Sequence, residues 1–206
     1  MSDAPDDPAI ENQTAGTAQP IWADVPLAVA FLTRLPVPAR HDAGPGALAR
    51  AGWAFPLAGL LVGGLGAAVI MATAGTGLHP IAAALLALAV MAVITGALHE
   101  DGLADFADGL GVHGRERRLE VMRDSRTGAF GVLALVFATG LKATALASVP
   151  GPGSAALALI AAAALSRAVM VPAMAMLAPA RADGLSKGAG RPPIWAAGLA
   201  VALGLA

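Results

Sequence analysis

Three aspartates in the middle of the chain have a spacing that could bind a metal ion. Asp101, Asp105 and Asp108 are separated by four and then three positions. An α-helix turns by about 100° per residue, so the three side chains would point within about 60° of one another. Like charges this close repel, and without a cation they would tend to take up a proton. The spacing therefore favours a divalent cation at this face.

The expected cation is a hard one, Mg²⁺ or Mn²⁺. The sequence contains no cysteine, so the ligands must be oxygen or imidazole donors. Mg²⁺ typically uses one or two carboxylates and shares its other positions with water and substrate phosphates. Gly102 and Gly109 each follow an aspartate and leave room where a side chain would block a diphosphate. We therefore expect a Mg²⁺ site for a phosphorylated substrate.

Several other polar residues near these aspartates could contact such a substrate. Arg123 and Arg126 are candidates for the diphosphate, because guanidinium groups match phosphate oxygens with two parallel hydrogen bonds. Arg34 could approach the same surface from the N-terminal segment. His99 could act as a ligand or a proton carrier, although a histidine in this setting is often structural. For the arginines at 115, 117 and 118, pairing with neighbouring acids explains their presence equally well.

The composition indicates that a membrane must position these groups. Hydrophobic residues make up 57% of the chain, charged residues only 13%, and the mean hydropathy is +0.70. Soluble domains contain about 25% charged residues, so this chain has too few to cover a water-facing surface. The formal net charge of −1 offers no basic excess for nucleic-acid binding. Both a soluble globule and a nucleic-acid-binding protein are excluded.

Apolar runs long enough to cross a bilayer divide the chain. About 20 apolar residues span the hydrocarbon core as a helix. Runs of this kind cover 52–75, 78–98, 128–149 and 154–177, and a fifth begins at 193 and is still apolar at Ala206, as expected of a chain cut short there. Small residues such as Gly59, Gly63, Gly64 and Gly66 predict close helix packing in lipid.

The remaining segments complete the predicted architecture. Residues 1–20 are acidic and polar, which is typical of a disordered tail, and 21–35 is a short apolar segment expected to lie at the interface. Basic residues fall in alternate loops, which predicts that the segment 99–127 faces the cytoplasm. The expectation is an all-α, polytopic membrane bundle of about five to six apolar helices, with one catalytic domain over 21–206.

Four stretches of the sequence resemble the adenosylcobinamide-GDP ribazoletransferase, or cobalamin synthase, family. They are H-x-D-G-L-A-D-x-x-D-G at 99–109, M-R-D-S-R-T-G-A-F-G at 122–131, F-L-T-R-L-P-V-P at 31–38 and F-P-L-A-G-L-L-V-G at 55–63. The resemblance implies a multi-pass enzyme of the bacterial inner membrane. It implies that α-ribazole or its 5′-phosphate is joined to adenosylcobinamide-GDP with release of GMP and a requirement for Mg²⁺. An oligomer is compatible with it.

The resemblance also implies roles for the residues already singled out. Asp101 and Asp105 would bind Mg²⁺ with help from Asp108, which is also the candidate base for the incoming hydroxyl. These two roles of Asp108 compete, because a metal-bound carboxylate is a poorer base. Asp124 is the second choice as ligand or base.

Two other readings remain open at this point. A CDP-alcohol phosphotransferase also places spaced aspartates at a membrane surface, with a usual D-G-x-x-A-R pattern. Here Asp101-Gly102 is followed by Leu103-Ala104-Asp105, without that arginine. A cation transporter could line an ion path with these aspartates, Lys142 and Arg167. Both of these cations lie inside apolar runs, where an ionisable group indicates either a functional cavity or a side chain that reaches for the interface.

Overall fold

The computed structural model describes residues 20–39, 44, 46–181 and 184–206. The predicted acidic tail therefore lies almost wholly outside the described residues. All the regular elements within the described ranges are helical, as predicted. The longer helices are α1 (Asp24–Leu32), α3 (Phe55–Thr73), α4 (Pro80–Thr95), α5 (Leu98–Leu110), α7 (Ala129–Ala147), α8 (Pro152–Met176) and α10 (Ile194–Leu205). The short elements are η2 (Ile21–Ala23), α2 (Ala47–Ala51), η3 (Gly52–Ala54), α6 (Arg115–Val121) and α9 (Leu185–Ala189).

The apolar helices make this a polytopic membrane protein. Three helical segments of the described chain are long and apolar enough to cross a bilayer. They are the continuous segment from α2 to α3, helix α7 and helix α8. Helices α4 and α5 pass the same test only as a pair, and they meet at an angle of 93°. Helices α1 and α10 are shorter apolar helices. The predicted multi-pass helical bundle is confirmed, and this bend ends the helix of the predicted run 78–98 at Thr95.

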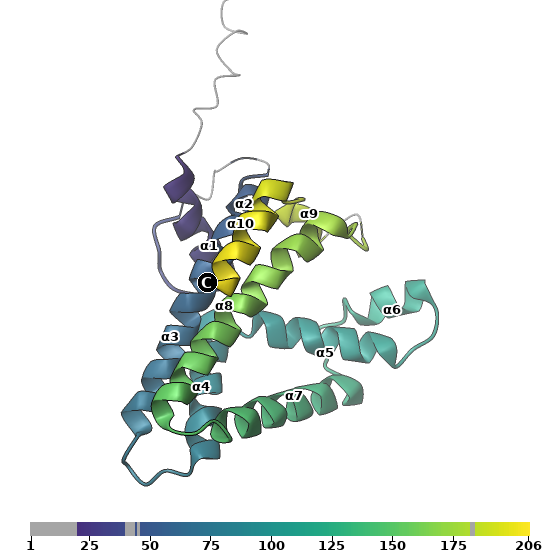
Figure 1. Cartoon of the computed structure of the whole chain (residues 1–206). Helices are drawn as coiled ribbons and strands as arrows, with labels where there is room; N and C mark the ends of the chain where they lie inside the picture. The colour runs from purple at the N-terminus through teal and green to yellow at the C-terminus, as the bar shows by residue number, and fades with distance from the viewer. Residues whose placement is uncertain (1–19, 40–43, 45, 182–183) are drawn as a thin grey trace, which may run out of the picture.

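The centre of the bundle is the contact between α3 and α8, which lie side by side (Figure 1). A Cβ atom at Gly59 would lie 2.5 Å from the carbonyl oxygen of Ala163, and one at Gly63 would lie 2.8 Å from the Cα of Ile160. Only glycine allows backbones to approach this closely. The predicted close packing is confirmed for these two glycines, whereas Gly64 faces open space.

The N-terminal helix α1 is fixed to the bundle by a buried ion pair. Asp24 is only 1% exposed. Its carboxylate accepts a hydrogen bond of 2.7 Å from the Arg50 guanidinium and one of 2.9 Å from the indole Nε1 of Trp53. A buried carboxylate is costly unless it is paired in this way. Asp24, which interrupts the apolar run at 21–35, is therefore part of the packing of α1.

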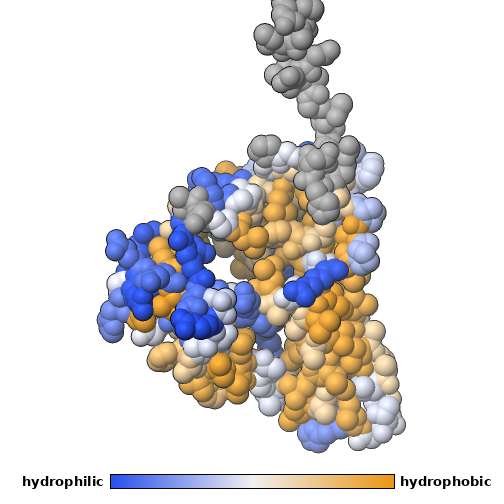
Figure 2. All heavy atoms as spheres, turned by 180° about the vertical axis from the view of Figure 1, so that it is seen from behind, coloured by the Kyte–Doolittle hydropathy of each residue, from blue (hydrophilic) through white to orange (hydrophobic). Residues whose placement is uncertain are grey.

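Helices α5, α6 and α7 extend to one side of the column formed by α3, α4 and α8 (Figure 1). Helix α7 packs on α4 and α5 and exposes large apolar side chains, among them Phe137 and Leu141. From the opposite side, Figure 2 shows the hydrophilic surface gathered on this side lobe, beside a hollow that separates it from the apolar column. An exposed apolar face of this kind suits contact with lipid.

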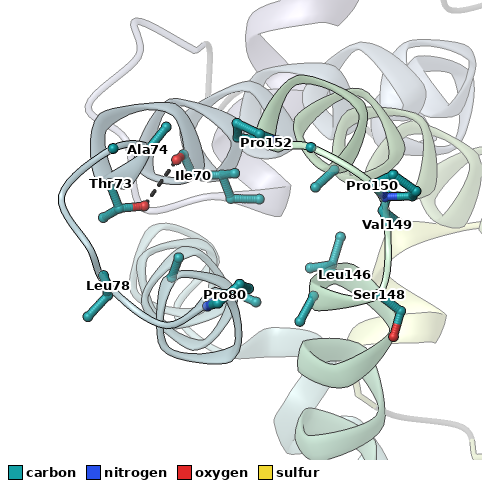
Figure 3. Close-up of a pocket in the computed structure, with 16 residues that line it drawn as sticks. Ile70, Thr73, Ala74, Leu78, Pro80, Leu146, Ser148, Val149, Pro150 and Pro152 are labelled. Carbon is teal, nitrogen blue, oxygen red and sulfur yellow. Dashed lines mark hydrogen bonds between the residues drawn. The ribbon is translucent and has the colours of Figure 1, made fainter.

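The two uncharged loops meet at one end of the molecule. Residues of both the α3–α4 and the α7–α8 connections line a pocket of about 420 Å³, shown in Figure 3. The residues that line it include Thr73, Leu78, Leu146 and Pro152, and none of them is titratable. This pocket offers no acid, base or cation, so the chemistry must lie elsewhere. The pairing of the uncharged loops agrees with the predicted alternation of basic and uncharged connections.

Candidate functional site

The helix that carries the three aspartates begins at an unusual backbone turn. Gly96 has φ 65° and Ala97 has φ 56°, so two successive residues adopt the left-handed conformation. Ala97 is the one residue other than glycine with positive φ in the described ranges, a conformation that costs of order 1 kcal/mol or more. These two residues turn the chain by 93° from α4 into α5. Strain of this kind persists only where the surrounding contacts fix the backbone.

Arg34 lies against this turn. Its backbone N–H donates a 2.7 Å hydrogen bond to the carbonyl of Ile94, and its guanidinium occupies the space that a side chain at Gly96 would need. The structure thus brings Arg34 from the segment after α1 to the start of the aspartate helix. Contact between Arg34 and a phosphorylated substrate stays a prediction.

The three aspartates occupy one helix, with different surroundings. Asp101 is exposed, while Asp105 and Asp108 are half-buried. Helix α5 turns away from the spans and carries ionisable residues on every turn, so we place it outside them. Burial, followed by the charges of Asp101 and Asp108, raises the pKa of Asp105 above its ordinary value. A cation beside Asp105 would oppose this shift, because it stabilises the charged form.

Asp108 is engaged by the first turn of α7. Its Oδ2 accepts a 2.7 Å hydrogen bond from the N–H of Gly128, and its Oδ1 accepts one of 2.8 Å from the N–H of Gly131. A carboxylate at this position satisfies amides that have no partner within the helix and is favoured by the helix dipole. A side chain at Gly128 or Gly131 would collide with Asp108. The sequence analysis did not foresee this capping contact, although T-G-A-F-G supplies both glycines.

The described residues do not form a ready-made metal cage. No three histidine, aspartate or glutamate side chains converge in this part of the chain to hold a metal ion. Asp108 does not converge with Asp101 and Asp105, because its two carboxylate oxygens face backbone amides at the start of α7. Asp101 and Asp105 remain one helical turn apart on the accessible side.

The two glycines of this face have different surroundings. A Cβ at Gly109 would lie 3.0 Å from the Cγ of Met122, so a side chain there would have to displace that methionine. At Gly102 a Cβ would meet nothing within 4 Å. Glycine within a helix costs about 1 kcal/mol relative to alanine. Packing does not explain Gly102, and the room it leaves for a substrate stays a prediction.

Asp124 and Arg126 form a solvated pair with each other. The Arg126 guanidinium donates to both carboxylate oxygens of Asp124, the shortest contact being 2.7 Å. These side-chain hydrogen bonds lower the pKa of Asp124 to about 2. A carboxylate that binds a proton this weakly is a poor general base near neutral pH. The geometry therefore gives no support to Asp124 as the base.

His99 and Glu100 face the spanning helices. The Nε2 of His99 lies 3.3 Å from the Sδ of Met170 on α8, and its Nδ1 is buried without a hydrogen-bond partner. The carboxylate of Glu100 lies 3.9 Å from the Nζ of Lys142 on α7. The ammonium group of Lys142 therefore lies near the start of α5. Sequence reasoning passed over Glu100 because its partner is 42 positions away.

These features define a class of protein: a multi-pass helical membrane protein that carries a carboxylate face on a helix set beside its spans. A sequence model of the cobalamin-5-phosphate synthase family matches residues 24–206. The chain belongs to this family.

Curated relatives extend over most of the chain. An adenosylcobinamide-GDP ribazoletransferase of Bradyrhizobium diazoefficiens is 52% identical over 189 residues, covering 91% of this chain and 73% of that protein. Proteins of the same name from Azorhizobium caulinodans and Sinorhizobium medicae are 50% and 47% identical, covering 84% and 89% of this chain and 67% and 72% of their own lengths. No solved structure matches the chain.

Proposed function

We propose that the carboxylate face of α5, with a bound Mg²⁺, carries out the reaction of the cobalamin-5-phosphate synthase family. The chain joins a ribazole to adenosylcobinamide-GDP in cobalamin biosynthesis. What we add is the assignment of residues, metal and membrane side. The observation that carries it is the half-buried Asp105, whose pKa is raised by burial and by Asp101 and Asp108, next to the unfilled space at Gly102.

In the proposed reaction, a hydroxyl of α-ribazole or of its 5′-phosphate attacks the phosphorus attached to cobinamide. A new P–O bond forms, the bond from this phosphorus to the bridging oxygen breaks, GMP leaves with the electron pair, and the hydroxyl proton passes to the departing phosphate or to solvent. Negative charge develops on phosphate oxygens throughout. Positioning of the reactants and electrostatic stabilisation supply most of the catalysis in such transfers.

The donor set fits Mg²⁺. Asp101 and Asp105 offer hard oxygen ligands one helical turn apart, which matches the one or two carboxylates that Mg²⁺ commonly takes from a protein. When bound, Mg²⁺ would neutralise charge on the diphosphate. Asp108 would serve as a third ligand only through the lone pairs left free by Gly128 and Gly131. Its capping contacts fit a positioning role better than that of the base.

The remaining residues have supporting roles in this proposal. Arg34, at the start of α5, and Arg123 and Arg126, in the connection to α7, would contact phosphate oxygens. His99 packs on α8, so we expect it to shape the wall of the site. The basic connections support a cytoplasmic position for this face in a bacterial inner membrane, and the apolar surface of α7 would then contact lipid.

The test is release of GMP by the purified protein. With adenosylcobinamide-GDP, α-ribazole and Mg²⁺ the protein should release GMP, and EDTA should stop the release. Asp105→Asn should lower turnover at least about a hundredfold, in the range found when a transition-state electrostatic contact is lost. Glu116→Gln removes an exposed carboxylate of α6 and should leave turnover unchanged.

Two results would contradict the proposal. Near-normal turnover by Asp105→Asn would show that the metal assignment is wrong. Release of CMP from CDP-diacylglycerol and an alcohol, or ion flux in vesicles without GMP release, would replace the reaction with the phosphotransferase or transporter reading. Membrane insertion of each variant is checked by its yield in the membrane fraction.

A further inference from the structure

Lys142 is a charged residue within a spanning helix, and the proposed reaction gives it no role. It is the one ionisable residue of α7, and α7 is long and apolar enough to cross a bilayer. An ammonium group at such a position is costly, so it usually has a partner and a function. The partner of Lys142 therefore indicates what this residue does.

That partner is Glu100, in the first turn of α5. The Nζ of Lys142 lies 3.9 Å from the Oε1 of Glu100, and the Glu100 side chain is half-buried. Among the described residues, Glu100 supplies the carboxylate at ion-pair distance from Lys142. Opposite charges attract each other more strongly where water is scarce than in bulk water. The pair therefore links a spanning helix to the helix that carries the three aspartates.

Helix α5 is also held against α7 at its other end. There Asp108 accepts hydrogen bonds of 2.7 and 2.8 Å from the backbone N–H groups of Gly128 and Gly131, at the start of α7. The two contacts come in opposite order along the two helices, so α5 and α7 run antiparallel. Asp101 and Asp105 lie between the two contacts. The direction of α5, and with it the placement of these two carboxylates, depends on both.

Helix α8 approaches the same first turn of α5. The Nε2 of His99 lies 3.3 Å from the Sδ of Met170. Arg167 lies one helical turn before Met170, and its charge interacts with that of Glu100. Glu100 therefore faces a cation on each of two spanning helices. Of these helices, α7 packs more extensively on α5, and its Lys142 is the cation at ion-pair distance.

We propose that Lys142 is a positioning residue for the transfer reaction. Through Glu100 it fixes the direction of α5 and so places Asp101 and Asp105 against the metal and the substrate. This inference rests on the proposed function, in which these two aspartates bind Mg²⁺. The effect can be large, because a displacement of about 1 Å that originates far from the reacting atoms can lower the rate about a hundredfold.

The first experiment measures the direction of α5 without metal or substrate. Nitroxide labels are attached at Leu110→Cys in α5 and Leu157→Cys in α8, in the full chain reconstituted in nanodiscs. Both positions are exposed, and the sequence has no cysteine of its own. Pulsed electron paramagnetic resonance then gives the distribution of distances between the labels. Lys142→Gln should shift or broaden this distribution, whereas Lys142→Arg keeps the charge and should preserve it.

Lys187→Gln is the matched control. It removes the other lysine of the chain, which is exposed on α9. The distance distribution and the turnover should both stay at the parent values. If Lys142→Gln does not reach the membrane fraction, Glu100→Gln breaks the same pair without changing the sequence of α7 and gives the comparison.

The second experiment compares turnover. Lys142→Gln and Glu100→Gln should each lower kcat for GMP release by about tenfold or more, because each leaves a charge without its partner. KM should change less, since the pair does not contact the substrate. Glu100→Gln/Lys142→Gln removes both charges and should lose no more than either single variant, as coupled residues do. Glutamine is used in place of a charge exchange because Arg167 also faces Glu100.

Three results would overturn the inference. They are an unchanged distance distribution in Lys142→Gln, losses of kcat that multiply in the double variant, and a rise in KM for adenosylcobinamide-GDP in Lys142→Gln without a change in distance. The last result would make Lys142 a substrate contact. Near-normal turnover by Asp105→Asn would instead contradict the metal assignment and leave the distance measurement unaffected, so the two failures are distinguishable.

Discussion

Asp101 and Asp108 are both aspartates of α5, yet their surroundings differ. Asp101 is exposed, whereas both oxygens of Asp108 accept amide hydrogen bonds from the start of α7. In Asp108→Asn, the side-chain NH₂ would face one of these N–H groups. One donor would lose its partner, and the negative charge at the helix N-terminus would disappear.

We therefore expect Asp108→Asn to lower the free energy of unfolding by about 1–3 kcal/mol. Asp101→Asn should leave it within about 0.5 kcal/mol, as is usual for a surface substitution, while it lowers GMP release strongly. Unfolding by detergent titration and the GMP assay measure the two effects. A stable Asp108→Asn protein without activity would instead assign Asp108 to the chemistry.

Gly102 allows helix stability and substrate access to be separated. Alanine at this exposed helix position meets no atom within 4 Å and should raise the free energy of unfolding by up to about 1 kcal/mol. If the space is used by a substrate, the same change should lower kcat/KM by about tenfold or more.

Gly140→Ala is the control for this change, because Gly140 also lies within a helix and faces open space. It should leave kcat/KM unchanged. Full activity of Gly102→Ala would show that the glycine has no role in access.

At the scale of elements, the contact between α3 and α8 depends on one face of α3. A methyl group at Gly63 would lie 2.8 Å from the Cα of Ile160, an atom that cannot move without the backbone. Gly63→Ala should therefore lower the free energy of unfolding by about 1–3 kcal/mol, the usual cost of overpacking. Gly64→Ala, one position along and facing open space, should cost nothing. Equal behaviour of the two variants would mean that α3 and α8 pack on a different face.

The spanning helices are the part of the fold that the sequence predicts well. Hydropathy and the small residues identify the runs that become α3, α7 and α8, because both signals are local. The direction of α5 is not local, since it depends on the left-handed turn at Gly96 and Ala97. A glycine could be recognised as a helix end, but nothing in an alanine indicates positive φ.

In the candidate site, too, the local features could be predicted from the sequence and the non-local contacts could not. The periodicity of the aspartates places them on one face, as the structure confirms for the helix itself. The function of each one depends on partners distant in the sequence. Asp108 accepts a hydrogen bond from an amide 20 positions away, and Asp24 accepts one from a side chain 26 positions away. Contacts of this range follow from tertiary packing, which spacing alone does not encode.

At the scale of the whole molecule, charge and shape agree with the proposed orientation in the membrane. The uncharged connections share one end and line one pocket, whereas α5 and α6 lie on the side lobe (Figure 1), where Figure 2 shows a large hydrophilic surface. Lys and Arg in short connections favour the cytoplasmic side. The proposed diphosphate chemistry would then take place where nucleotide-bearing substrates are made.

The absence of cysteine from the sequence makes this orientation directly measurable. Single-cysteine variants at exposed positions, Thr76→Cys and Ser148→Cys in the uncharged connections and Arg117→Cys on α6, give three reporters on a background without thiols. In intact spheroplasts, an impermeant maleimide should label the first two and not the third, because the bilayer blocks its access to the cytoplasm. Permeabilised cells should label all three. Labelling of Arg117→Cys in intact spheroplasts would place the carboxylate face outside and reverse the proposed topology, while a difference between Thr76→Cys and Ser148→Cys would separate two loops that line the same pocket.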